Sequence, residues 1–400
     1  MERTHMKILI FSWNHQALRI GEMEKLPQEE ENFEEVITAT VAWSLSKFYE
    51  SHPPDFFPEW EKIILDSNPD VVVFGSQEDA IPGSYFHSDF LPKKMADLYY
   101  NLQKRTRLMG FGVETYKAIK TFDFKLRGLR LSIYAKPYLT GLIELEERGM
   151  RDFLGEKGQS WANCSFPFLQ SKGAVASYLK IPGMDLIVFI CSHLPFDAES
   201  IKEAYLTRNT KIREKAVTYS NLSFNYLLQE LVFNVRLDNI DENPFDVGHV
   251  FFFGDLNYRV FSLEKGMEDQ FLSNDKETLK KIWQENDELY RELGKGHILL
   301  DFEEGVNNDG PLFLPTCKMK KPRKSIHEAS CITDVFNIGQ GQRKPSWSDR
   351  ILYCDRKKTK SVTQCLEYDR LDSGKTIQKS DHAAIYGLYT ITKIIDDETI

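Results

Sequence analysis

Apolar residues run together or alternate in a series of short segments that are typical of strands. The clearest are 71–75, which follows an Asn-Pro-Asp turn, and 247–253, which ends in three phenylalanines. Continuous runs of this kind are typical of strands buried on both faces. Further strands are expected at 7–13, 108–116, 129–136, 139–145, 173–180, 184–192, 347–353, 361–368 and 384–392.

Apolar positions spaced three and four residues apart predict helices between these strands. Helices are expected at 33–49, 57–66, 90–104, 201 to about 237, and 263–293, the last with a break near Ser273 and Asn274. A loop is expected over 305–322. Helices interspersed among strands that are partly linked as hairpins predict an α/β fold. We expect a four-layer α/β sandwich, with two packed, mainly antiparallel or mixed sheets flanked by helices.

Composition narrows the class of protein. The chain has 400 residues, 42% of them hydrophobic, with no Gly-, Ser- or Pro-rich linker and no repeat. We therefore expect one large domain over 1–395, followed by a short acidic tail at 396–400. The net charge of −9 argues against general nucleic-acid binding, which depends on neutralising phosphates with Lys and Arg.

Cysteine usage and the lack of long apolar runs indicate where in the cell the protein acts. Six cysteines without a CxxC pair are typical of reduced thiols in a cytosolic protein. The apolar run 8–11 is too short for a signal-peptide core, and no stretch approaches the ~20 apolar residues of a membrane helix. We expect a cytoplasmic protein whose membrane contact is peripheral. Two loops, 81–86 and 312–314, carry apolar groups that either dock on anionic lipid or pack locally.

Several predicted strands end in a polar or charged residue. Asp255 and Asn257 would project from the same face of a strand end, because residues two apart share a face, and Gly254 allows close backbone approach. Convergence of such strand ends is the expected construction of an α/β active site. The residues at these ends are Asn14, Glu78, His193, Asp255, Asn257, Asp349, Asp381 and His382.

Two long segments carry a family resemblance. The segment 249–261 reads HVFFFGDLNYRVF and 344–353 reads KPSWSDRILY. They resemble the paired signatures of the inositol polyphosphate 5-phosphatases, which share a metal-dependent phosphohydrolase fold with apurinic/apyrimidinic endonucleases. Shorter matches to the same family occur in order at 13–14, 69–78, 171–175, 192–194, 208–209, 310–318 and 380–382.

The resemblance implies an Mg²⁺-dependent site. Glu78 would be the main metal ligand, with Asn14 and Asp381 beside it, because Mg²⁺ prefers a few hard oxygen ligands. Asp255 would orient and deprotonate the attacking water, and Asn257 would help to hold it. His193 and His382 would donate to the phosphoryl oxygens. Asp349 would orient His382 through a hydrogen bond.

The resemblance also implies a substrate. Tyr258, Arg259 and Lys318 match positions that bind the 4-phosphate, and Lys172 matches one that faces the 1-phosphate. The implied activity is hydrolysis of the 5-phosphate of phosphoinositides such as PI(4,5)P₂ and PI(3,4,5)P₃, or of soluble inositol polyphosphates such as Ins(1,4,5)P₃. Ser171 and Cys317 depart from the family pattern, which has asparagine and an aromatic residue there.

Other interpretations compete with this one. Taken singly, a polar residue at a strand end is more often a cap or turn group than a functional one. Arg350 is interpreted as a structural ion-pair partner, and Trp347 as a core residue. At the level of the whole chain, the alternatives are a nuclease or other phosphodiesterase of the same fold, and a catalytically inactive phosphoinositide-binding module. The oligomeric state is not indicated.

Overall fold

We analysed a computed structural model of the chain. The structure describes residues 5–14, 57–78, 91, 94–96, 98, 117–122, 129–140, 144–150, 172–196, 203, 210–233, 248–260, 267–320, 328–338, 344–371 and 380–394. The predicted helix at 33–49, the predicted strand at 108–116 and the apolar loop at 81–86 lie outside these residues, as does most of the predicted helix at 90–104.

In the part of the chain that the structure describes, twelve strands form two six-stranded sheets. The first sheet has the order β11 (Ser361–Leu371), β12 (Ala384–Lys393), β1 (His5–Asn14), β2 (Val71–Gln77), β4 (Arg130–Ala135), β3 (Lys117–Phe122). The second has the order β5 (Glu144–Met150), β6 (Gly173–Lys180), β7 (Ile187–His193), β8 (His249–Asp255), β10 (Asp349–Asp355), β9 (Glu303–Glu304). The fold predicted from the pattern is confirmed: both sheets are mixed and mainly antiparallel.

Each sheet contains one parallel pair, and that pair determines where the sheet can carry a site. β1 runs parallel to β2, and β7 runs parallel to β8, while the other pairings are antiparallel. The carboxyl ends of parallel strands meet at one edge of a sheet. In the first sheet, Asn14 lies opposite Gln77 in the register, and in the second, His193 lies opposite Asp255.

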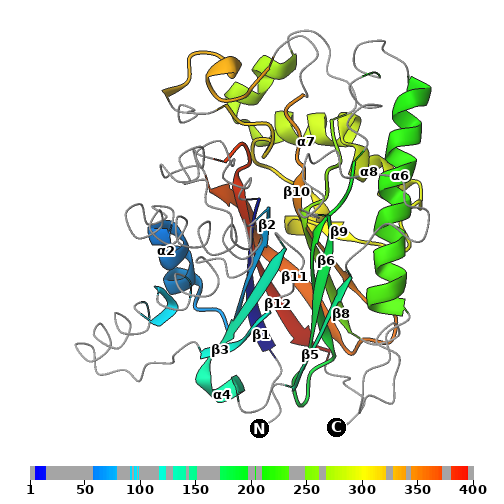
Figure 1. Ribbon diagram of the computed structural model, residues 1–400. Coiled ribbons are helices and arrows are strands. Elements are labelled where there is room, and N and C mark those ends of the chain that lie inside the picture. Colours follow the sequence, from blue (N-terminus) through cyan, green and yellow to red (C-terminus); the bar gives the residue numbers. More distant parts are fainter. Residues whose placement is uncertain are drawn as a thin grey trace, which may run out of the picture.

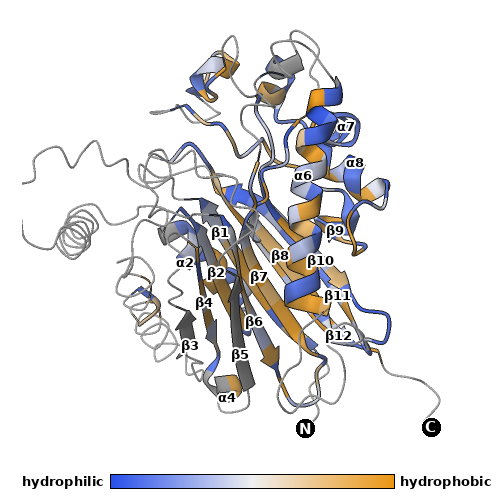
Figure 2. Cartoon of the chain, turned by 45° about the vertical axis from the view of Figure 1, so that its right-hand side comes forward, coloured by the Kyte–Doolittle hydropathy of each residue, from blue (hydrophilic) through white to orange (hydrophobic). Residues whose placement is uncertain are grey.

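Helices cover the outer faces of the two sheets. Figure 1 shows α2 (Phe57–Ser67) on one side and α6 (Thr210–Leu228) on the other, which gives the four layers. Trp60 and Ile64 of α2 are buried with Phe74 of β2. Phe224 of α6 packs edge-on against Phe252 of β8, with 4.2 Å between ring centroids. In Figure 2, β7 and β8 of the second sheet are mostly hydrophobic, whereas α6 carries both kinds of residue.

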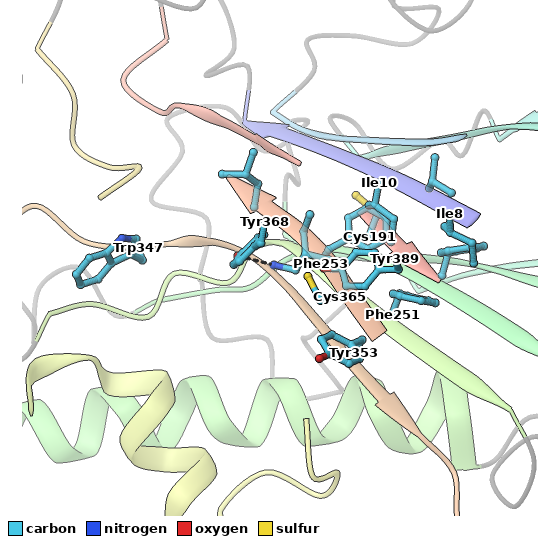
Figure 3. Packing of buried hydrophobic residues seen from close by; sticks show 14 of the residues in the cluster. Ile8, Ile10, Cys191, Phe251, Phe253, Trp347, Tyr353, Cys365, Tyr368 and Tyr389 are labelled. Carbon is cyan, nitrogen blue, oxygen red and sulfur yellow. Dashed lines mark hydrogen bonds between the residues drawn. The ribbon is translucent and has the colours of Figure 1, made fainter. Parts of the chain in front are cut away.

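The main core lies between the two sheets. Figure 3 shows Ile8 and Ile10 of β1 together with Phe251 and Phe253 of β8 and Tyr389 of β12. All five residues are buried in one cluster. Burial of large apolar side chains at roughly 1.5–3 kcal/mol each is the main stabilising contribution in such a core. The core therefore fixes the two sheets face to face and holds their polar edges together.

Local structure departs from the sequence pattern in several places: β3 was not predicted as a strand, and two other departures have clear local causes. The predicted strand at 139–145 is wrong at 139–140, which belong to the short helix α4 (Pro137–Thr140) before β5; Pro137 occupies the first helical position, which proline favours. The predicted helix at 263–293 breaks at 273–275 as expected, and again at Asp287. Asp287 ends α7 (Lys276–Asn286) and caps α8 (Glu288–Gly294) by accepting from Tyr290 N at 2.9 Å.

The remaining short elements complete the described chain: the π-helical turn Gln229–Phe233 continues α6, and 3-10 turns cover Met267–Ser273, Val306–Asn308 and Ile332–Asp334. Among the helices that the structure describes, none combines the length and the apolar character needed to cross a membrane.

Candidate active site

The register of the second sheet aligns several predicted site residues in one row. Asp255 ends β8 and lies between two neighbours, His193 at the end of β7 and Asp349 at the start of β10. Gly173 of β6 lies opposite His193, so Lys172 enters the same edge. Four adjacent strands thus present their polar ends together.

Close packing of β7 and β8 at this edge requires glycine at 254. Gly254 has φ +131°, a conformation that L side chains rarely adopt. A Cβ atom there would lie 1.9 Å from the carbonyl oxygen of Ser192. The close backbone approach expected from the sequence is therefore present, and it places the Asp255 carboxylate beside the His193 ring.

Asp255 is the centre of the site. Its Oδ2 accepts a hydrogen bond from Asn14 Nδ2 at 2.9 Å and lies 3.3 Å from His193 Nε2 and 3.9 Å from His382 Nε2. The side chain is almost fully buried. Burial by itself would raise the pKa of Asp255, but His382, His193 and Lys172 outweigh it and hold the pKa well below its usual range. Asp255 is therefore a charged hydrogen-bond acceptor at neutral pH.

His382 is oriented by a buried carboxylate. The hydrogen bond expected between Asp349 and His382 is present: His382 Nδ1 donates to Asp349 Oδ2 at 2.8 Å. Burial by itself would lower the pKa of His382, but Asp349, Cys317 and Asp255 raise it well above its usual value. The protonated His382 ring donates from Nδ1 to Asp349, which leaves its Nε2–H as a donor on the side of Asp255.

His193 connects the two sheets at the site. Its Nε2 contacts Lys172 Nζ and lies 3.8 Å from Oε1 of Glu78, which follows β2 of the first sheet. Glu78 has φ +50°, which is uncommon for a residue other than glycine or asparagine. Backbone strain of this kind is concentrated at functional sites. The Glu78 side chain is 29% exposed, so its carboxylate is accessible to solvent.

Asn257 and Arg259 form the turn after β8. Asn257 also has positive φ, +59°; its backbone N–H donates to Asp255 Oδ1 at 3.1 Å, and its Nδ2 donates to the carbonyl oxygen of Leu194 at 2.8 Å. Arg259 Nη2 donates to Asn257 Oδ1, and Nη1 points at Cys317 Sγ at 3.4 Å. The turn therefore keeps Asn257 beside the carboxylate and places the Arg259 guanidinium behind it.

Lys318 and Asp381 form a pair next to this group. Lys318 Nζ lies 3.4 Å from Asp381 Oδ2, and Asp381 Oδ1 lies 3.9 Å from His382 Nε2. The neighbouring residue Cys317 bridges both Ser346 and His382 through the backbone. This pairing attaches the 310–318 loop to the segment before β12, so that Lys318 reaches the site.

The structure does not bring Tyr258 to the site. Its ring is buried on the α6 side of the second sheet, and its hydroxyl donates to Asn221 Oδ1 of α6 at 2.8 Å. Burial raises the pKa of this phenol well above its usual value. Tyr258 lies three residues after Asp255 and therefore on the opposite face, together with Leu256, where apolar packing under α6 holds it. This position corrects the expectation that Tyr258 binds substrate, because the Tyr258 hydroxyl is buried against α6.

Two further expectations have clear outcomes. The apolar tip at 312–314 packs locally: Phe313 lies 5.0 Å from Tyr368 between ring centroids, and both Phe313 and Leu314 are buried. Arg350 is structural, as predicted, because it is fully buried and binds both Asp287 and Glu304. Ser171, Arg208, Asn209 and most of the basic segment after Lys320 lie outside the described residues.

The donors at the sheet edges are compatible with a divalent cation. Glu78 supplies an exposed carboxylate, Asn14 an amide oxygen and Asp255 a second carboxylate, and these hard oxygens suit Mg²⁺. Among the described residues, Asp255, Asp349 and His382 also place potential ligand atoms within 4.8 Å of one another. Because Asp349 and His382 are already hydrogen-bonded to each other, we interpret Asp349 as the residue that orients His382. Glu78, Asn14 and Asp255 are the better set of metal ligands.

Sequence reasoning missed three residues that shape the site. Phe196 lies under two of the predicted substrate-binding cations, with 5.4 Å from Lys172 Nζ and 5.2 Å from Arg259 Cζ to its ring centroid. The aromatic residue directly after Ser192-His193-Leu194-Pro195 was the available signal. Arg213 and Glu288 hold the turn at 258–260 from behind, and no local motif marks them.

Comparison with known proteins places the chain in a family. The sequence pattern of the Endonuclease/Exonuclease/phosphatase family 2 matches residues 12–388. This match covers most of the chain, so the protein belongs to that family. The resemblance carried by the two long signatures is confirmed at this level.

Individual relatives are similar in sequence or in fold. The phosphatidylinositol polyphosphate 5-phosphatase type IV of Rattus norvegicus is 28% identical over 224 residues, which is 56% of this chain and 30% of the relative. Synaptojanin of Caenorhabditis elegans is 27% identical over 221 residues, 55% of this chain and 16% of the relative. The chain therefore spans less than a third of either relative.

A solved structure shares the fold. It is the inositol polyphosphate 5-phosphatase domain of SpSynaptojanin, in complex with inositol (1,4)-bisphosphate and calcium ion. The TM-score is 0.54 at 19% sequence identity, with 98% of this chain and 87% of that chain covered. At this identity the comparison supports the two-sheet architecture alone.

Proposed function

We propose that the protein is an Mg²⁺-dependent phosphatase that hydrolyses the 5-phosphate of phosphoinositides such as PI(4,5)P₂ and PI(3,4,5)P₃, or of soluble inositol polyphosphates such as Ins(1,4,5)P₃. The observation that carries the proposal is the buried Asp255 carboxylate, which has one histidine at 3.3 Å and another at 3.9 Å. An ionised acceptor flanked by two potential donors suits attack of water on a phosphoryl group.

The protein residues divide the work of the reaction. Asp255 orients and deprotonates the attacking water, so that a lone pair of the water oxygen is directed at phosphorus. His382, kept protonated by Asp349, and His193 donate to phosphoryl oxygens as charge moves in the transition state. The new bond joins the water oxygen to phosphorus, and the bond from phosphorus to the inositol 5-oxygen, in line with it, breaks. Asp255 takes the proton of the water, and the leaving oxygen takes a proton from solvent. A cation held by Glu78 and Asn14 would polarise the phosphoryl group and balance charge on the leaving oxygen.

Local charge supports a phosphate-bearing substrate. The chain has a net charge of −9, yet three cations lie at the site: Lys172 and Arg259 contact the ring of Phe196, and Lys318 pairs with Asp381. Cations collected at one edge of an acidic protein fit the recognition of a compact polyphosphate better than the tracking of a long nucleic-acid backbone. In the proposed complex Arg259 and Lys318 contact the 4-phosphate and Lys172 faces the 1-phosphate, with Asp381 near the metal.

The proposal extends to organisation and location. Residues 1–395 would form one catalytic domain and 396–400 a short acidic tail. The protein would act in the cytoplasm, with peripheral contact to the anionic cytosolic face of membranes when the substrate is a lipid. Lys318 and Lys320 are the described part of the basic segment available for that contact, since the 312–314 tip is packed into the protein.

A substrate panel tests the proposal against its competitors. Phosphate release with Mg²⁺ is measured from PI(4,5)P₂, PI(3,4,5)P₃, Ins(1,4,5)P₃ and abasic DNA. The variant is Asp255→Asn, and the matched control is Asp355→Asn, which makes the same change at the other end of the sheets. We expect the wild type to release phosphate from inositides. Asp255→Asn should abolish this release, and Asp355→Asn should leave it unchanged. Greater activity on abasic DNA would favour the nuclease, and lipid binding without turnover would favour the inactive module.

The position of attack has its own test. Hydrolysis in ¹⁸O-labelled water is expected to place the label in the released phosphate, because the water oxygen bonds to phosphorus. Recovery of the label in the inositol product would refute attack at phosphorus.

A further inference from the structure

The turn after β8 is held from behind by a buried ion pair between two helices. Arg213 of α6 places Nη2 2.7 Å from Oε1 of Glu288, the first residue of α8. Both side chains are buried. A buried pair of this kind is costly to desolvate and is weak evidence for stability alone, so its contacts with the rest of the site matter.

Those contacts fall on the backbone of the site turn. Arg259 N donates to Glu288 Oε2 at 2.7 Å, and Glu288 N donates to the carbonyl oxygen of Arg259 at 3.0 Å. Arg213 Nη2 also donates to the carbonyl oxygen of Val260 at 2.8 Å. Both backbone polar groups of Arg259 are thus bonded to one glutamate, and the next carbonyl is bonded to its arginine partner.

The position of that backbone reaches the reacting group in two steps. The Arg259 guanidinium donates to Asn257 Oδ1, and the backbone N–H of Asn257 donates to Asp255 Oδ1 at 3.1 Å. A shift of Arg259 therefore moves both a phosphate-binding cation and the residue that orients the carboxylate. A misplacement of about 1 Å at a reacting centre can cost about 100-fold in rate.

We propose that Glu288, oriented by Arg213, is a positioning residue for hydrolysis that acts through Arg259. The inference rests on the proposed function, because Arg259 is a substrate contact in that proposal. It specifies how Glu288 acts: the hydrogen-bond acceptor at its carboxylate fixes the Arg259 backbone, and the Arg213 charge fixes the carboxylate.

A matched pair of substitutions separates the acceptor from the bulk of the side chain. Glu288→Met keeps the length but removes the acceptor, whereas Glu288→Gln retains one acceptor oxygen. Glu288→Met is expected to lower kcat/KM for Ins(1,4,5)P₃ by about tenfold or more, and Glu288→Gln is expected to lose less. The same order is expected for the affinity of Ins(1,4)P₂, measured by calorimetry.

A double-mutant cycle distinguishes positioning from general destabilisation. If Glu288 acts through Arg259, Glu288→Met has less than about a twofold further effect in an Arg259→Ala background. Losses that multiply independently in the two backgrounds would overturn the proposal. Asp355→Asn, at the other end of the sheets, is the control for loss of stability and is expected to leave kcat/KM unchanged. If Glu288→Met does not fold, Arg213→Lys, which keeps the charge but not the planar fork, takes its place in the cycle.

The binding arm separates failure of this inference from failure of the proposed function. If the wild-type protein hydrolyses no inositol phosphate, weaker Ins(1,4)P₂ binding by Glu288→Met, with no further weakening in the Arg259→Ala background, still supports the positioning role. Equal affinities of wild type and Glu288→Met would overturn the positioning role. Absence of Ins(1,4)P₂ binding by the wild type would overturn both.

Discussion

Replacement of Gly254 with alanine should separate the two strands that carry His193 and Asp255. The added Cβ would lie 1.9 Å from the carbonyl oxygen of Ser192, and real contacts of this kind are not shorter than 3.0 Å. The strands must therefore part by at least the difference, about 1.1 Å. The present separation of 3.3 Å between His193 Nε2 and Asp255 Oδ2 would then exceed hydrogen-bond distance.

The expected result is a fall of about 100-fold in kcat/KM for phosphate release, since a displacement near 1 Å at a reacting centre has that effect. Gly183→Ala is the matched control: Gly183 has φ +82°, so alanine is strained there too, but nothing lies within 4 Å of the added Cβ. That control should lose about 1 kcal/mol of stability, measured by urea unfolding, and keep its activity. Equal kcat/KM in Gly254→Ala and wild type would refute the reasoning.

Three further predictions address stability, pH and metal. Arg350→Met leaves the carboxylates of Asp287 and Glu304 buried without their cation and should cost about 3–5 kcal/mol in urea unfolding, whereas a change below 1 kcal/mol would show that the cluster tolerates the loss. Burial by itself would raise the pKa of Asp355, but hydrogen bonds from His249 and Thr363 hold that pKa below its usual value. The resulting stability is present above the unfolded pKa of about 3.9 and is lost as pH falls through the lower folded pKa. Asp355→Asn should therefore flatten the fall of the unfolding free energy at acid pH, and an unchanged fall would contradict this. Removal of divalent cations with EDTA should abolish turnover that Mg²⁺ restores, with a higher Mg²⁺ requirement in Glu78→Gln; full activity in EDTA would contradict the metal assignment.

The strand ends could be predicted because two independent patterns coincide there. Apolar runs located the strands that end at Asn14, His193 and Asp255, and polar residues followed each of them directly. The order of strands within the sheets does not follow from local pattern, since β12 pairs with β1 across almost the whole chain. The resemblance to a known family supplied the convergence that periodicity could not.

The misses have identifiable physical causes. Tyr258 lies three residues after Asp255, so strand alternation places it on the opposite face, with Leu256, against the role that the family resemblance implied. Pro137 converted the start of a predicted strand into a helical turn. Glu288 and Arg213 lie far from Arg259 in sequence, so only the packing of α6 and α8 on the second sheet reveals their contacts with it.

The most direct test of the central claim is to identify the product of Ins(1,4,5)P₃ with wild type and Asp255→Asn in the presence of Mg²⁺. Hydrolysis centred on Asp255 predicts Ins(1,4)P₂ and inorganic phosphate from the wild type, with a loss of at least about 1,000-fold in the variant. A product that retains the 5-phosphate, or equal turnover by Asp255→Asn, would contradict the claim.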